Sequence, residues 1–114
     1  MADCLFCRVI RREIPAQIIR EDDTALAFAD INPQAPTHIL IIPKRHIATL
    51  NDLTPADEQA VGHLVCLAAQ IAREHHIDQA GYRTVINTNQ QAGQSVFHIH
   101  VHLLGGRPMH WPPG

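Results

Sequence analysis

The sequence has no long hydrophobic run and no excess of positive charge. Two of its uncharged stretches rich in apolar residues, Ile31 to Pro43 and Gln59 to Ala72, stop short of the about 18 residues that a membrane-spanning helix requires. Nine Lys and Arg residues stand against eleven Asp and Glu residues, for a net charge of -2. Broad binding to nucleic acid or to an anionic membrane needs a positive field. We therefore expect neither nucleic acid nor membrane as a partner.

Cysteine is also scarce. The chain has three cysteines, and an odd number does not make a disulfide framework. The first residues lack the apolar stretch of a secretory signal, so we expect the reducing cytoplasm as the compartment. A length of 114 residues suits one domain. We expect that domain over residues 1–114, with an extended Gly- and Pro-rich tail at 105–114.

Histidine is the residue in excess. Nine histidines outnumber the three Phe, one Tyr and one Trp together. Imidazole titrates near neutral pH, binds metals and attacks electrophiles. The hydrophobic content of 46% and the charged content of 18% are typical of a globular protein. The composition therefore indicates histidine chemistry on a globular scaffold.

Two helices are predicted. A short one lies within residues 4–12, and Pro15 prevents it from continuing. A long one begins after Thr54, which is followed by Pro55 and by an acidic residue at the third helical position, and it ends near residue 75. Its apolar stripe consists of Val61, Leu64, Val65, Ala68, Ile71 and Ala72.

Strand patterns lie before and after the long helix. They cover residues 18–19, 25–29, 38–42, 82–87 and 97–104, with a polar loop at 89–93. Strands outnumber helices, so we predict an α+β fold with a mainly antiparallel sheet.

His98, His100 and His102 alternate with apolar residues in the last predicted strand. Because side chains alternate in a strand, the three imidazoles are expected on one face, with the intervening residues from Phe97 to Leu103 buried on the other. Three interpretations are open: polar residues on an open sheet face, metal ligands, or a nucleophilic imidazole whose neighbours position and protonate the reacting groups. A regular strand does not make three rings converge on one ion, which weighs against the metal.

The residues just before the histidines favour the nucleophile. Gly93, Gln94 and Ser95 offer backbone N–H groups and a hydroxyl that suit a phosphate. A phosphate held there would lie beside the histidines. A Gly-x-Ser sequence alone is only a turn, so these residues count only together with the histidine strand.

The segment Gly93 to Leu104 closely resembles the signature of the histidine-triad (HIT) superfamily, His-x-His-x-His followed by apolar residues. The similarity continues through Asp30 to His38 and through Ile42 to His46. The tail, Gly105 to Gly114, resembles the Hint branch of that superfamily. The similarity covers nearly the whole chain.

This resemblance implies a nucleotide-binding fold with a five-stranded sheet, one long helix and one short helix. It implies a homodimer in which two sheets join into one, and hydrolysis or transfer at the α-phosphorus of a purine nucleotide, without an organic cofactor. By match to the motif, His100 is the nucleophile that forms a covalent nucleotidyl-histidine. His102 then donates a hydrogen bond or a proton to the leaving group, and His98 completes the triad.

The resemblance also implies nucleotide contacts. Asp30 matches the residue that binds the ribose hydroxyls, with Ile31 beside the base, and Asn87 matches a phosphate and ribose contact. Trp111 matches a tryptophan that reaches the partner subunit's site. The purine cleft is matched by residues that would also suit a plain hydrophobic core: Phe6, Val9, Ile14 and Phe28.

Cys4 and Cys7 have the two-residue spacing of a zinc-binding pair. A redox pair is the alternative, although no strand precedes it. Several HIT proteins combine such a pair with two histidines that match His46 and His98, as a structural zinc site. Many members of the Hint branch lack these cysteines. His46 is therefore either a zinc ligand or a catalytic residue near the reacting phosphate.

Three functions compete at this point. The first is a purine nucleoside phosphoramidase that cleaves the P–N bond of an adenosine or guanosine phosphoramidate, favoured by the Hint-like tail. The second is a dinucleoside polyphosphate hydrolase, which needs the same nucleophile. The third is a nucleotide-binding adaptor, against which the intact triad argues, because a binder needs no placed nucleophile.

Overall fold

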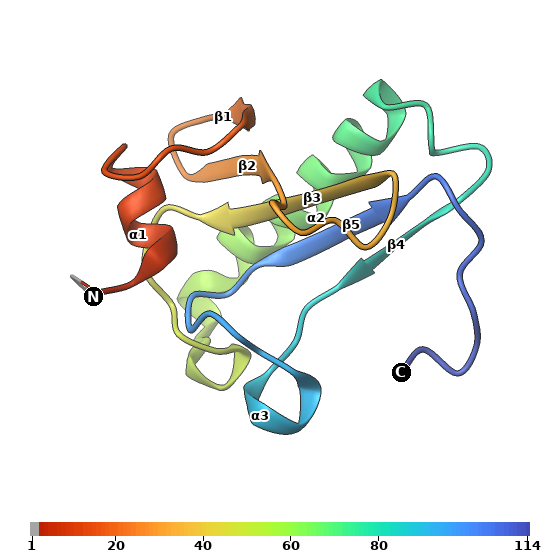
Figure 1. Ribbon diagram of the computed structural model, residues 1–114. Helices are drawn as coiled ribbons and strands as arrows, with labels where there is room; N and C mark the ends of the chain where they lie inside the picture. Colours follow the sequence, from red (N-terminus) through yellow and green to blue (C-terminus); the bar gives the residue numbers. More distant parts are fainter. Residues whose placement is uncertain (1–2) are drawn as a thin grey trace.

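The computed structural model describes residues 3–114 and contains one five-stranded sheet (Figure 1). Neighbouring strands are antiparallel and follow the order β1-β2-β3-β5-β4. The predicted α+β fold is therefore confirmed. The strands are β1 (Ile18–Glu21), β2 (Ala25–Ala29), β3 (Thr37–Pro43), β4 (Tyr82–Val85) and β5 (Val101–Gly105).

The long helix α2 (Glu58–Glu74) covers one face of the sheet, behind it in Figure 1. A 3₁₀ turn over Pro55–Asp57 leads into it, and the side chain of Asp57 accepts from the backbone N–H of Thr54. The buried residues of α2 are Leu64, Leu67, Ala68, Ile71 and Ala72, and they pack against alternate residues of β2, β3 and β5.

Part of the predicted stripe of α2 is wrong. Val65 is 52% exposed, and Leu67, absent from the prediction, is buried. The helix contacts the sheet along a line centred on Leu64, Ala68 and Ile71, and Val65 lies beside that line.

The short helix α1 (Leu5–Ile10) lies on the opposite face. The thiol of Cys4 caps it by accepting from the backbone N–H of Cys7, at 3.4 Å. Phe6 and Val9 pack against the residues of β2 and β3 that point away from α2: Leu26, Phe28, Leu40 and Ile42. Helix α1 covers only part of this face, which leaves room beside β5.

The segment before β5 departs from the prediction. The strand begins at Val101, not at Phe97, and Phe97 is 49% exposed rather than buried. The backbone leaves the ladder here because the N–H of Ile99 donates to the carbonyl of Ile47, at 2.8 Å. His98 is consequently fully buried.

Three smaller differences concern the loops. The predicted polar loop contains a short helix, α3 (Asn89–Ala92), and β4 ends two residues earlier than expected. A 3₁₀ turn, Leu50–Asp52, precedes the long helix. Within residues 3–114, every helix is too short or too polar to cross a bilayer.

Candidate active site

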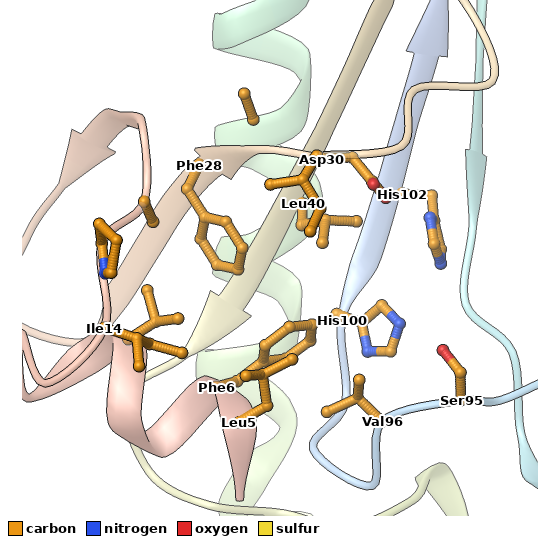
Figure 2. A pocket seen from close by; sticks show the side chains of 15 residues that line it. Leu5, Phe6, Ile14, Phe28, Asp30, Leu40, Ser95, Val96, His100 and His102 are labelled. Carbon is orange, nitrogen blue, oxygen red and sulfur yellow. The ribbon is translucent and has the colours of Figure 1, made fainter.

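A cavity of about 230 Å³ opens between α1, the end of β2 and the start of β5 (Figure 2). One side is apolar, and Figure 2 shows Phe6, Ile14 and Phe28 there. The other side is polar and carries the two histidines His100 and His102. The remaining lining residues are Leu5, Val9, Pro15, Ala16, Ala29, Asp30, Ile31, Leu40, Ser95 and Val96.

His100 is held in one tautomer. Its Nδ1 lies 2.8 Å from the backbone carbonyl of His98, and a carbonyl only accepts, so Nδ1 carries the hydrogen and Nε2 keeps a free lone pair. Phe6 meets the ring edge-on, with centroids 5.1 Å apart. Burial lowers the pKa of His100 below the usual value, so the ring is neutral at pH 7. A buried, neutral and oriented imidazole meets the requirements of a nucleophile.

His102 is the middle member of a chain of hydrogen bonds. The backbone N–H of Gln34 donates to Nδ1 of His38, at 3.0 Å, so the hydrogen of neutral His38 is on Nε2. That nitrogen lies 2.9 Å from Nδ1 of His102, which therefore accepts and leaves the hydrogen of His102 on Nε2. Burial, then the neighbouring histidines, lower the pKa of His102 to about 4.

His38 is a site residue that is not among those predicted from the sequence. His38 and Leu40 share one face of a buried strand, but only the register, which pairs Leu40 with His102, connects His38 to the site. His38 and His102 are therefore diagonal neighbours across two strands, within reach of long side chains.

Asp30 and Ile31 lie where β2 ends. One carboxylate oxygen of Asp30 accepts from the backbone N–H of Asn32, at 2.8 Å. The other lies 3.4 Å from Nε2 of His38. Ile31 lines the cavity but is 98% exposed, so it stands at the rim.

Several predicted nucleotide contacts lie away from the cavity. The backbone N–H groups of Gly93 and Gln94 donate to carbonyls of α3, at 3.0 and 3.1 Å. They are therefore not free for a phosphate, contrary to the expectation from the sequence. The Gln94 side chain is buried and holds the backbone of Ala48, Asn89 and Val96. Asn87 is half-buried and Trp111 is 81% exposed, and neither lines the cavity.

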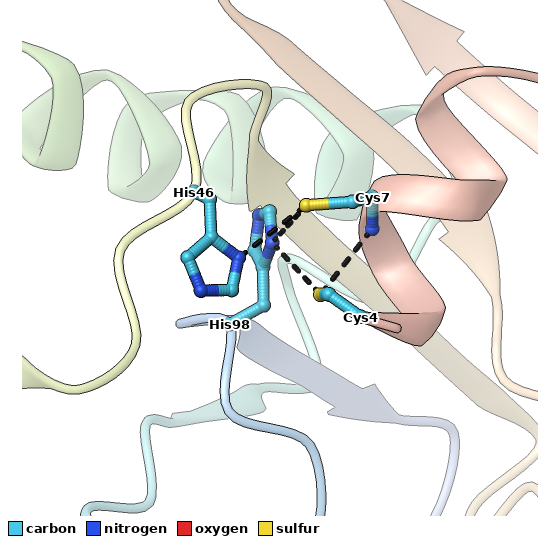
Figure 3. A group of neighbouring side chains, drawn as sticks. All are labelled: Cys4, Cys7, His46 and His98. Atoms are coloured by element: carbon cyan, nitrogen blue, oxygen red, sulfur yellow. Dashed lines mark hydrogen bonds between the residues drawn. The ribbon is translucent and has the colours of Figure 1, made fainter. Parts of the chain in front are cut away.

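His98 and His46 also stay outside the cavity. Together with Cys4 and Cys7 they form a second cluster, in which the four side chains point toward one another (Figure 3). The thiols of Cys4 and Cys7 lie 3.5 and 3.6 Å from Nδ1 of His98, and the Cys7 thiol lies 3.3 Å from Nδ1 of His46. In this arrangement His98 contributes its side chain to the cluster and its carbonyl to His100.

The spacing of the cluster fits a tetrahedral zinc ion. Zn–S bonds of about 2.3 Å and Zn–N bonds of about 2.0–2.1 Å at tetrahedral angles place sulfur and nitrogen about 3.6 Å apart. The observed separations are 3.3, 3.5 and 3.6 Å. Nε2 of His98 donates to the carbonyl of Pro43, at 2.7 Å, which turns Nδ1 toward the thiols as a metal ligand would require. Burial raises the pKa of the Cys7 thiol, with a further contribution from Cys4, so binding a metal there would release a proton.

A second group of possible ligands is better explained without a metal. Ligand atoms of Asp30, His38 and His102 lie within 4.8 Å of one another. The facing nitrogens of the two histidines are hydrogen-bonded to each other, however, and Nδ1 of His38 already accepts from Gln34.

Comparisons with known proteins show which proteins the chain is similar to. The family model described as HIT domain matches residues 11–109. The purine nucleoside phosphoramidase of Escherichia coli K12 is 53% identical over 107 residues, which cover 94% of this chain and 90% of that protein. A crystal structure of a HIT family hydrolase from Legionella pneumophila has a TM-score of 0.97 at 52% identity, covering 98% of this chain and 100% of the other. A HIT family hydrolase from Clostridium thermocellum has a TM-score of 0.93 at 43% identity, covering 96% of each chain.

Proposed function

The chain belongs to the HIT domain family, and on that premise we propose that it is a purine nucleoside phosphoramidase. It hydrolyses the P–N bond of adenosine or guanosine 5′-phosphoramidates through a covalent nucleotide on His100. One observation carries the proposal: the free Nε2 of a neutral, buried His100 borders a cavity that is apolar at one end and polar at the other. The similarity of this chain to a purine nucleoside phosphoramidase supports the assignment of an amine as the leaving group.

The two ends of the cavity suit the two ends of a nucleotide. The purine lies among Phe6, Val9, Ile14 and Phe28, the residues to which the family resemblance assigns it. The ribose hydroxyls bind the carboxylate of Asp30, which keeps free lone pairs beside the bond to Asn32. Of the three residues expected at the phosphate, only Ser95 keeps that role, because Gly93 and Gln94 are engaged in α3.

The first step forms a bond between Nε2 of His100 and phosphorus, and the P–N bond breaks with its electron pair on the departing nitrogen. That nitrogen accepts a hydrogen bond from the Nε2–H of neutral His102, takes a proton from solvent and leaves as an amine. The carbonyl of His98 stabilises the positive charge that develops on His100.

The second step regenerates the site. Water attacks phosphorus, the bond to Nε2 of His100 breaks, and its electron pair returns to the imidazole. The proton released by the attacking water passes to solvent, and the nucleoside monophosphate leaves. One water is consumed and one amine and one monophosphate are formed.

We further propose a zinc ion held by Cys4, Cys7, His46 and His98. The spacing of their ligand atoms supports it. Zinc there would be structural, since four protein ligands complete a tetrahedron. His46 then serves the metal and not the phosphate. Reduced thiols at this site fit the expected cytoplasmic compartment.

The homodimer also remains a proposal. Strand β4 is an edge of the sheet, and a second copy could add to it there. Trp111 is exposed and lies away from the cavity of its own chain, which supports a role in the partner's site.

The test compares turnover of adenosine phosphoramidate with turnover of diadenosine polyphosphates by the same preparation. The proposal expects a higher kcat/KM for the phosphoramidate. Faster cleavage of the polyphosphate would instead favour a dinucleoside polyphosphate hydrolase. Tight binding of AMP without turnover of either substrate would favour a nucleotide-binding adaptor.

A further inference from the structure

The C-terminal tail is fastened to the loop that joins β2 to β3. Nε of Arg107 donates to the backbone carbonyl of Gln34, at 3.0 Å. Gly106, at φ +92°, lies against Pro36, and a Cβ there would stand 2.9 Å from the Pro36 Cβ. Two consecutive residues of the tail therefore contact the loop that runs from Asp30 to Pro36, directly before Thr37 and His38 of β3.

The residue that Arg107 holds also sets the tautomer of a histidine. Gln34 accepts from Arg107 through its carbonyl and donates its own N–H to Nδ1 of His38. His38 in turn donates to His102, the proposed hydrogen-bond donor to the departing nitrogen. A continuous path of three hydrogen bonds thus runs from the tail to the reacting groups.

We propose that Arg107 is a positioning residue that keeps the Nε2 hydrogen of His102 available to the leaving group, acting through Gln34 and His38. This inference rests on the proposed function. If the N–H of Gln34 moves away, His38 is free to carry its hydrogen on Nδ1 and to accept at Nε2. His102 must then donate from Nδ1 to that nitrogen, and its Nε2 faces the cavity without a hydrogen.

Asp30 limits the size of the effect. Its carboxylate lies 3.4 Å from Nε2 of His38 and also favours a hydrogen there. That separation is long for a hydrogen bond, whereas the bond from Gln34 has a length of 3.0 Å. Losing one hydrogen bond changes a tautomer population by roughly 2- to 10-fold, so we expect a change of that size and not a complete loss of activity.

The chain offers a matched control in Arg83. Its guanidinium donates to the carbonyl of His110 in the same tail, at 3.0 Å, and has no described bond to Gln34. Arg107→Met removes the bond to Gln34, Arg107→Lys keeps a donor, and Arg83→Met loosens the tail elsewhere. Thermal unfolding of all three shows whether the fold is retained.

The kinetic measurement uses adenosine phosphoramidates of substituted anilines with similar size and different basicity. Arg107→Met should lower kcat for the most basic aniline by roughly 2- to 10-fold, with a smaller loss for the least basic one. The kcat of Arg107→Met thus depends more steeply on leaving-group basicity than that of wild type, while the KM values stay close to wild type. Arg107→Lys should restore part of the loss. Arg83→Met should change kcat by the same factor for all substrates.

The second measurement is the ¹⁵N NMR spectrum of the histidine rings, which distinguishes the two tautomers. Wild type and Arg83→Met should show the hydrogen of His102 on Nε2, and Arg107→Met should show a mixture. A wild-type tautomer and a wild-type dependence on basicity in Arg107→Met would overturn the inference. Failure of the proposed function is a separate result, because wild-type protein would then turn over none of the anilides.

Discussion

Replacing Cys7 by Ser should remove the proposed zinc ion and loosen the cavity with it. Helix α1 has six residues, far fewer than an isolated helix needs for stability in water. The same helix places Phe6 and Val9 in the wall of the cavity. A metal that joins Cys4 and Cys7 to His46 and His98 fixes this helix to the loop after β3 and to the segment before β5.

The size of the effect follows from binding linkage. A ligand present at 100 times its Kd stabilises the folded state by about 2.7 kcal/mol. For a domain of about 100 residues, each kcal/mol shifts Tm by roughly 4 °C, so removing the metal should lower Tm by roughly 10 °C. Affinity for AMP should fall as well, because the apolar wall is no longer held.

The assay combines metal analysis with thermal unfolding, on protein purified without chelators and again after EDTA. Wild type should contain about one zinc per chain and should lose stability in EDTA. Cys66→Ser is the matched control, since Cys66 is an exposed free cysteine on α2, outside the cluster. The reasoning would be refuted if wild-type protein contained no metal, had reactive thiols at Cys4 and Cys7, and kept its Tm in EDTA. His46 would then be assigned to the reacting phosphate and not to a metal.

Three further predictions concern proton transfer, pH and the tail. His102→Ala should lower kcat/KM for phosphoramidates with amine leaving groups by roughly 10²–10⁴-fold. The decrease should be smaller for a substrate whose leaving group departs without a proton. Burial opposes ionisation of Asp22, but hydrogen bonds from His63 and from backbone N–H groups outweigh it and lower its pKa from 3.8 to about 2. A lowered folded-state pKa stabilises the protein above about pH 4, and this contribution is lost as pH falls toward 2. Both side chains are more than a third exposed, so it amounts to less than about 1 kcal/mol, and Asp22→Asn should flatten that part of the Tm-against-pH curve. Deleting Met109 to Gly114 should change the ratios of kcat/KM between phosphoramidates of differently shaped amines more than it changes the affinity for AMP. An equal loss of kcat/KM for all of these substrates would indicate that the tail has only a structural role.

The elements predicted from the sequence follow from strong local signals. Thr54, Pro55 and Asp57 mark the start of the long helix, and the apolar run of β3 marks a central strand. The family resemblance alone predicts that Phe6, Phe28, Asp30, His100 and His102 line one cavity, since each apolar residue by itself suits a core.

What could not be predicted depends on contacts between distant segments. His98 looked like the first of three histidines on one strand face, but the backbone bond from Ile99 to Ile47 turns it into the interior. The N–H groups of Gly93 and Gln94 looked available for an anion until α3 engaged them. The pairing of His38 with His102 depends on the register of β3 against β5, which the sequence pattern does not define.

Rapid quenching of the reaction with adenosine phosphoramidate, followed by mass spectrometry of the whole chain and its peptides, tests the central claim most directly. The account predicts a transient adenylyl group on the peptide that contains His100. His100→Ala should keep its fold and its affinity for AMP, should form no adduct and should turn over slower by orders of magnitude. An adduct on another residue of the wild type, or normal turnover by His100→Ala, would contradict the account.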